Sequence, residues 1–274
     1  MITNNFFIVA AIVIYLLVML AIGFVFSKNN SNTEDFYLGG RKLGPFVTAM
    51  SAEASDMSSW LLMGLPGVAY LSGVCDAAWT AIGLGIGTYL NWLFVARRLR
   101  RYSANINALT VPSFYSKRFH DDKNILNAIC ALVIVIFFIP YTASGFAACG
   151  KLFNSLFGVD YMAAMVVSAI VIVGYTIMGG FKAVSTTDFI QSCVMTIALV
   201  VVLGFGITAA GGFDAVMANA NSMAGYLSLT AMHDAASGTA SPYGFITIIS
   251  TMAWGLGYFG MPHILLRFMA IEDP

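Results

Sequence analysis

A polar stretch interrupts the apolar sequence at residues 48–67, and its residue types could bind a cation. It carries two acids, Glu53 and Asp56, among several serines, and it ends in the sequence Gly-Leu-Pro-Gly. A carboxylate at bilayer depth is costly unless water, a partner or a bound cation compensates its charge. Small and polar residues also suit an unwound break in a membrane helix, where backbone carbonyls point at a ligand. The stretch therefore predicts an ion site at a broken helix; the alternative is a kinked helix whose acids reach the membrane interface.

The composition places this stretch inside a membrane protein. Hydrophobic residues make up 59% of the chain and charged residues 9%, with a mean hydropathy of +0.83, which lies outside the range of soluble domains. The 13 basic residues balance the 13 acidic ones, so no basic surface indicates a nucleic-acid partner. The four cysteines are scattered and predict neither a disulfide framework nor a zinc site. We therefore expect an all-α integral membrane protein whose partner is the lipid bilayer.

Apolar segments long enough to cross a bilayer recur along the chain, and we predict seven transmembrane helices. Glycines 83, 85 and 87 in the third segment predict close contact with another helix. Residues 211–243 are rich in Gly, Ala, Ser and Asn and predict a long flexible loop. The predicted spans are residues 6–26, 45–70, 75–96, 125–150, 161–178, 188–210 and 244–268.

The lysines and arginines predict how these spans are oriented. If the link after the first span lies in the cytoplasm, every basic residue except Lys151 falls in a cytoplasmic link or at a cytoplasmic helix end. The N-terminus is then outside and the C-terminus of this chain is cytoplasmic. We expect a multi-pass protein of the cell membrane, either the bacterial inner membrane or a plasma membrane.

The seventh span is interrupted like the second, with Trp254, Tyr258 and Pro262 set among glycines. Interruptions at matching places in two halves indicate a substrate site near the bilayer midplane of a transporter, whereas a proline kink alone would be the simpler explanation. The distance between the two spans fits five-helix inverted repeats. A single transporter domain then divides into an extra N-terminal helix with a cytoplasmic link (1–44), a first repeat (45–210), an external loop (211–243) and the first helix of a second repeat (244–274).

Several long motifs resemble those of one transporter family. They are S-A-E-A-S-D-M-S-S-W-L-L-M-G-L-P-G, A-W-T-A-I-G-L, N-A-L-T-V-P, G-G-F-K-A-V-S-T-T-D and W-G-L-G-Y-F-G-M-P-H-I-L-L-R-F-M-A. Together they resemble the sodium/solute symporter family, and within it the proline-transporting branch. The resemblance implies a LeuT-type fold and a sodium-coupled symporter, not an enzyme, that imports a small amino acid, most closely L-proline, by alternating access. It covers the family's first half, so a missing C-terminal half or a complementing chain is an expected partner.

The same resemblance assigns roles to individual residues. Sodium would bind to the carbonyls of Ala54 and Met57, and Asp56 resembles the acid required for tight sodium coupling. The remaining ligands would be hydroxyls on a later helix, so half of the oxygen cage should bind sodium weakly. Asp188 resembles an acid on the path of sodium release, although a solvated acid at a helix start is the other interpretation. The substrate site would be lined by Ser58, Gly64, Tyr141, Trp254, Tyr258 and Pro262.

Three residues depart from the family pattern, and they bear on the substrate. Glu53 and Ser59 stand where many members have glycine, and Met261 stands where the proline branch has glutamine. A sodium symporter for another small organic solute is therefore the alternative.

Other classes of membrane protein fit less well. A seven-helix receptor or retinal protein has the right span count, but retinal would need a lysine in the last span, which has none. An intramembrane aspartyl protease would need a second membrane acid facing Asp56. The histidines His120, His233 and His263 are too scattered for a metal triad, and we expect loop or packing roles for them.

Overall fold

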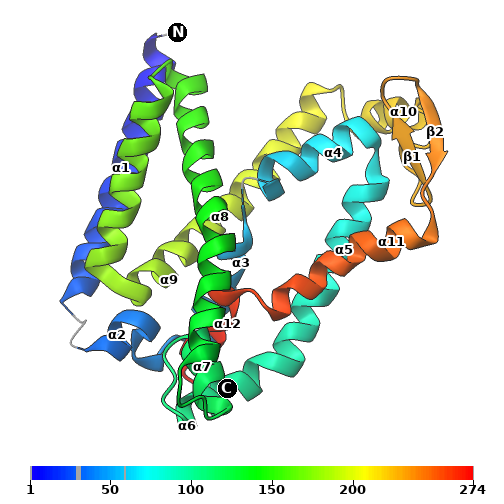
Figure 1. The fold of residues 1–274 in the computed structure, drawn as a ribbon. Coiled ribbons are helices and arrows are strands. Elements are labelled where there is room, and N and C mark those ends of the chain that lie inside the picture. Colours follow the sequence, from blue (N-terminus) through cyan, green and yellow to red (C-terminus); the bar gives the residue numbers. More distant parts are fainter. Residues whose placement is uncertain (1, 29–31, 59, 274) are drawn as a thin grey trace. The chain divides into compact units, whose positions relative to one another are not determined.

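A computed structural model describes residues 2–28, 32–58 and 60–273, and this part of the chain is mostly helical (Figure 1). The expected all-α fold is confirmed. The longer helices are α1 (Ile2–Ser27), α3 (Pro45–Asp56), α5 (Val74–Asn91), α8 (Ile125–Phe157) and α9 (Tyr161–Ala209). The shorter helices are α2 (Thr33–Leu38), α4 (Leu65–Ser72), α6 (Arg97–Asn105), α7 (Val111–Arg118), α10 (Phe213–Ser222), α11 (Phe245–Met252) and α12 (Pro262–Ala270). Short turns of other helix types are η1 (Gly39–Arg41), η2 (Trp60–Gly64), η3 (Trp92–Ala96) and η4 (Ala253–Phe259).

Four helices among the described residues are long and apolar enough to cross a membrane, by length and composition. They are Phe7–Ser27, Val74–Asn105, Ile125–Phe157 and Tyr161–Ala209. The last of these helices is kinked at Gly180, where φ is 60° and ψ is −159°. Only glycine adopts such a backbone easily, which explains why the helix kinks at this residue. The kink lies just after residue 178, the expected end of the fifth span. The two remaining predicted spans are interrupted in the structure, and seven crossings stay a prediction.

The described chain forms two compact units. Unit 1 comprises residues 1–56, 98–190 and 262–274, and unit 2 comprises residues 57–97 and 191–261. Two of the places where the chain passes from one unit to the other are the interruptions after α3 and before α12.

Unit 2 contains α5 packed closely against the α11–η4 segment. A Cβ atom built on Gly83 would lie 2.5 Å from the Met252 Cα, and one on Gly87 would lie 2.2 Å from the Gly255 carbonyl oxygen. Gly85 has open space around it. The predicted close helix contact is therefore confirmed at Gly83 and Gly87, and wrong at Gly85.

The segment 211–243, also in unit 2, is more ordered than its composition indicates. It contains α10 and an antiparallel hairpin of β1 (Ala231–Asp234) and β2 (Thr239–Pro242). The hairpin turns at Gly238, whose φ of 67° suits glycine, and the Ser237 hydroxyl donates to the Asp234 carboxylate over 2.6 Å. The expectation of a long flexible loop was wrong here, because these local turn interactions order the segment.

Unit 1 packs the first part of α9 against α1. A Cβ built on Gly23 would lie 3.1 Å from the Tyr175 Cβ, and one on Gly179 would lie 3.0 Å from the Gly23 Cα. Unit 1 also joins the start of α3 to the end of α12 through a short parallel bridge between Leu43 and Ile271. The bridge joins α3 and α12, the two half-helices of unit 1, which carry the polar groups described next.

Candidate functional site

The first predicted helix break is present in the structure. Helix α3 ends at Asp56, Met57 and Ser58 are not helical, and the chain continues as the π-type turn η2. Ser59 lies outside the described residues. Carbonyls in the last turn of a helix lack intrahelical donors, so Ala54, in the last turn of α3, and Met57, the first residue after it, have carbonyls that can offer oxygen to a ligand. This is the backbone that the sequence assigned to sodium.

The second break is also present. Helix α11 ends at Met252, the 3₁₀ segment η4 follows, and Gly260 and Met261 precede α12, which begins at Pro262. Proline suits this first helical position because it has no N–H and its fixed φ is already helical. Both interruptions predicted from sequence are therefore confirmed as local backbone features.

A buried ion pair lies in unit 1 behind the first break. An Arg267 Nη2 donates to the Asp188 Oδ2 over 2.7 Å, and the two side chains are 6% and 15% exposed. The Ser51 hydroxyl donates to the same carboxylate oxygen over 2.8 Å and accepts from the Arg267 Nε over 2.7 Å. The interpretation of Asp188 as a solvated helix-start acid is wrong, because Asp188 lies in the interior of α9 and its mostly buried carboxylate pairs with Arg267 of α12.

Further contacts fix Arg267 in place. Its Nη1 donates to the His263 carbonyl oxygen over 2.6 Å, and its guanidinium lies 5.6 Å from the centre of the Phe181 ring. The Ser55 hydroxyl lies 3.4 Å from the Asp188 Oδ2, so a second residue of α3 faces the pair. All three nitrogens of the Arg267 guanidinium therefore donate hydrogen bonds within the protein. The Asp188 carboxylate can take another cation as its partner only if these bonds break.

Tyr141 connects both half-helices of unit 1. Its hydroxyl donates to the Ser55 carbonyl oxygen over 3.2 Å, one residue before the end of α3. Its ring stacks on the imidazole of His263 at 6.0 Å with an interplanar angle of 19°. His263 directly follows Pro262, so Tyr141 contacts the start of α12. Pro262 is itself one of the residues predicted from sequence to line the substrate site.

Unit 2 holds the other predicted substrate residues. The Trp60 and Trp254 rings lie 4.3 Å apart at 43°, and Gly64 faces Trp60 so closely that a Cβ would lie 2.8 Å from the Trp60 Cδ1. Tyr258 is buried, and its carbonyl oxygen accepts a 2.9 Å hydrogen bond from the Asn91 Nδ2. Since Ser58, Gly64, Trp254 and Tyr258 belong to unit 2 and Tyr141 and Pro262 to unit 1, a common pocket for the six stays a prediction.

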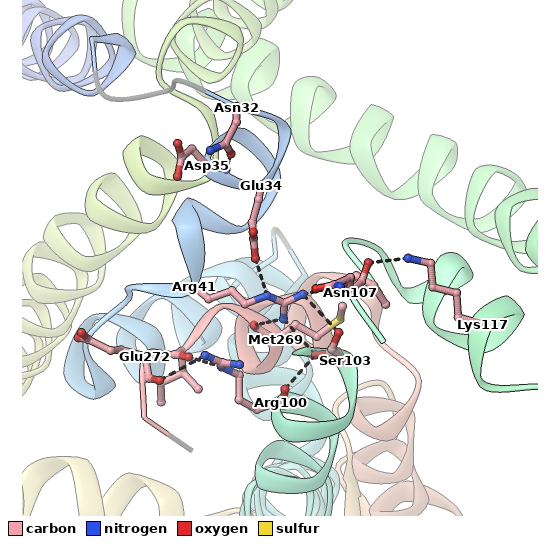
Figure 2. Close-up of polar contacts among 12 residues, drawn as sticks. Asn32, Glu34, Asp35, Arg41, Arg100, Ser103, Asn107, Lys117, Met269 and Glu272 are labelled. Atoms are coloured by element: carbon pink, nitrogen blue, oxygen red, sulfur yellow. Dashed lines mark hydrogen bonds and ion pairs between the residues drawn. The ribbon is translucent and has the colours of Figure 1, made fainter. Parts of the chain in front are cut away.

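A second buried arginine anchors the segment before α3. Figure 2 shows the Arg41 guanidinium between Glu34, Ser103 and Met269. Its Nε pairs with the Glu34 carboxylate over 2.8 Å, its Nη1 donates to the Met269 carbonyl over 3.0 Å, and its Nη2 donates to the Ala108 carbonyl over 2.7 Å. A guanidinium suits such a place because its planar fork of donors reaches several acceptors at once.

Backbone hydrogen bonds also connect the segment before α3 with the end of α12. The Leu43 N–H donates to the Ala270 carbonyl over 3.3 Å, and the Glu272 N–H donates to the Leu43 carbonyl over 2.9 Å. Arg100 also reaches the chain after α12, where its Nε donates to the Ile271 carbonyl (Figure 2). The start of α3 and the end of α12 are thereby held together at the end remote from their breaks.

Sequence reasoning missed several residues of this arrangement. Arg41 was counted only as a charge of a polar link, and Arg267 was noticed only within a motif. Arg267 had a usable signal, because an arginine inside an otherwise apolar segment needs a partner, and Asp188 was already a candidate. Ser51 and Ser55 lie four residues apart, which places both hydroxyls on one face of α3.

Comparisons with known proteins agree with this architecture. A sequence model of the sodium:solute symporter family matches residues 36–274. The chain is 45% identical over 267 residues to the osmoregulated proline transporter OpuE of Bacillus subtilis, covering 97% of this chain and 52% of that protein. It is 46% identical over 263 residues to the sodium/proline symporter of Escherichia coli, covering 95% and 50%. The chain thus spans about half the length of the curated relatives it matches.

A solved structure supports the fold. A Na⁺-coupled sialic acid symporter, in a substrate-bound outward-open state, matches with a TM-score of 0.74 at 19% identity, covering 96% of this chain and 53% of that one. The expected likeness to a LeuT-type symporter fold is confirmed, and the protein is a multi-pass membrane protein. On the family match across residues 36–274, the chain belongs to the sodium:solute symporter family.

Proposed function

We propose that the protein carrying this chain is a sodium-coupled secondary transporter that imports L-proline by alternating access. The observation that carries the proposal is the interruption after Asp56, where a helix end, an acid and several hydroxyls come together in a family of sodium symporters. Similar proteins of Escherichia coli and Bacillus subtilis are named for proline transport, which supports the substrate. The activity that we propose is transport, not enzymatic catalysis.

Sodium is a transported substrate in this proposal. The carbonyls of Ala54 and Met57 would coordinate it, and Asp56 would supply the negative charge that makes binding favourable. A hard cation prefers such oxygen ligands, and additional ones would come from sequence that the longer relatives contain. Asp188 would receive sodium on its way to the cytoplasm, by opening the pair with Arg267.

Proline would bind among the residues of the two interrupted helices. The aromatic faces of Tyr141, Trp254 and Tyr258 suit its apolar ring, while Ser58, Gly64 and Pro262 shape the backbone around it. Another small organic solute is the second candidate, because Met261 and Glu53 depart from the pattern of the proline branch.

We further propose the arrangement in the membrane. The chain would divide into an N-terminal helix and cytoplasmic link (1–44), a first repeat (45–210), an external segment (211–243) and the first helix of a second repeat (244–274). The basic residues around α6 and α7 would then face the cytoplasm and the N-terminus would lie outside. Accessibility of single cysteines introduced at Lys117 and at Ser237 to a membrane-impermeant reagent tests this orientation, because only the second should react in intact cells.

Uptake of labelled proline tests the function. The intact protein that carries residues 1–274 is expressed in cells without their own proline uptake, and sodium and proline concentrations are varied. We expect uptake that requires sodium and collapses with a sodium ionophore. Proline uptake that is indifferent to sodium, or none at all, would contradict the proposal.

Variants of Asp56 locate the coupling in the site. Asp56→Asn removes a charge next to the cation, so the sodium concentration for half-maximal uptake should rise about 10- to 100-fold, the value of one charge-assisted interaction. Asp56→Glu should do less harm. Glu53→Gln is the matched control, since Glu53 is an exposed acid on the same turn, and it should leave the sodium requirement within about twofold.

A further inference from the structure

The side chain of His263 has no partner in the protein as described. Both ring nitrogens are buried, and neither makes a hydrogen bond with any of the residues that the structure describes. A neutral imidazole always carries one N–H donor and one acceptor nitrogen, and buried polar groups are normally paired. His233 shows the usual situation, because its Nδ1 lies 2.8 Å from the Ala224 carbonyl oxygen. An imidazole beside a helix break whose two nitrogens are buried and unpaired therefore calls for a ligand.

The packing around His263 fixes the direction of its ring. The Phe138 ring lies edge-on at 5.5 Å and 67°, and the Tyr141 ring stacks at 6.0 Å. Aromatic contacts of this kind orient a ring but take up none of its hydrogen-bonding capacity. The ring is thus held by apolar contacts while its polar edge stays unused, so a role in packing alone does not account for a histidine here.

The neighbouring polar groups of unit 1 are already committed. The Tyr141 hydroxyl donates to the Ser55 carbonyl, and the guanidinium of Arg267 is bonded to Ser51, Asp188 and the His263 carbonyl. Pro262 has no N–H to offer. Among these residues at the start of α12, the imidazole of His263 is the side-chain donor left for a solute.

We propose that the imidazole N–H of His263 donates a hydrogen bond to the carboxylate of the transported amino acid. This assignment rests on the proposed function. The carboxylate is favoured over the ammonium group because His263 lies in the first turn of α12, where free backbone N–H groups and the positive end of the helix dipole attract anions. Tyr141, stacked on the imidazole, would place its ring face beside the same solute.

Uptake kinetics of the intact protein test the assignment. His263→Met removes the donor and keeps an apolar side chain of similar reach, so KM for proline should rise about 10- to 100-fold with the sodium requirement unchanged. His263→Gln retains a donor and should recover most of the affinity. Phe138→Leu is the control for packing, because it loosens the ring without removing a polar group. If His263→Met and His263→Gln have the same KM for proline, or if both match the unchanged protein, the donor role is wrong.

A substrate analogue separates a bond to the carboxylate from a structural effect. Prolinamide keeps the ring and the ammonium group but lacks the anionic carboxylate. The unchanged protein should prefer proline over prolinamide, and His263→Met should lose about 10-fold or more of that preference. Equal losses for both compounds would show that His263 supports the structure only.

A spectroscopic measurement covers the case in which the variants fail to fold. Histidine-selective NMR of the unchanged protein in lipid nanodiscs should show the His263 ring signal shift with proline and not with prolinamide. His120 and His233 provide internal references that should not move. A fixed His263 signal in protein that takes up proline overturns the inference and leaves the proposed function standing. Absence of sodium-dependent proline uptake contradicts the proposed function itself, and with it this choice of ligand.

Discussion

Replacing Arg267 by glutamine tests whether the buried pair with Asp188 holds unit 1 together. The substitution removes a guanidinium that is 6% exposed and leaves a carboxylate that is 15% exposed without its cation. It also removes the hydrogen bonds to Ser51 and to the His263 carbonyl, of 2.7 and 2.6 Å. Breaking a buried pair by removing one partner costs about 3–5 kcal/mol, so Arg267→Gln should lower the free energy of unfolding by that amount.

A double-mutant cycle isolates the pair from the other losses. Asp188→Asn leaves the guanidinium buried without its counter-charge and should also destabilise. In the double variant neither charge remains, so the combined loss should be smaller than the sum by about 1.5–3 kcal/mol, the value of a hydrogen bond to a charged group. Reversible unfolding of the chain in lipid–detergent micelles, followed by circular dichroism as SDS is added, gives each free energy.

Two further variants control this measurement. Arg98→Gln removes an exposed arginine of the same unit and should change the free energy of unfolding by less than about 0.5 kcal/mol. Arg267→Lys restores a charge but cannot reach three acceptors with one ammonium group, so it should recover only part of the loss. If the losses from Asp188→Asn and Arg267→Gln add to within about 0.5 kcal/mol, the two side chains are not coupled and the reasoning fails.

Two more substitutions probe other contacts in the same assay. Arg41→Lys should lower the free energy of unfolding by about 1–3 kcal/mol because buried carbonyls lose their donors, and Lys42→Gln, at an exposed neighbour, should not. Gly87→Ala should cost about 1–3 kcal/mol, since its Cβ would lie 2.2 Å from the Gly255 carbonyl, whereas Gly85→Ala meets open space and should be neutral or slightly stabilising. Equal effects within either pair would contradict the packing described.

The helix breaks could be predicted from sequence because their causes are local. Serines and acids after Thr48 compete with the helical backbone, and glycines around Tyr258 followed by Pro262 cannot continue a regular helix. The fifth predicted span ends at residue 178, two residues before the kink at Gly180. The strongly apolar composition of the chain predicted the fold class, and the long motifs indicated the family.

The partners of the polar groups could not be predicted in the same way. Asp188 and Arg267 are 79 positions apart, and the Arg41 nitrogens bond carbonyls 67 and 228 positions away. Such pairings depend on how the helices pack, for which a single sequence carries no periodic signal. The hairpin could not be predicted for another reason: its strands, A-M-H-D and T-A-S-P, have four residues each and lack the usual alternation of β-branched and polar residues.

The interruptions are stabilised by side chains from continuous helices in both units. In unit 1, the Tyr141 hydroxyl of α8 donates to the Ser55 carbonyl at the end of α3. In unit 2, the buried Asn91 amide of α5 donates to the Tyr258 carbonyl of η4, and Gly87 lets that segment approach closely. Unpaired backbone groups are costly at bilayer depth, so a broken helix persists only where such donors replace the missing helical bonds. The breaks are therefore built into the packing of each unit, because these side-chain donors bond carbonyls that a regular helix would satisfy internally.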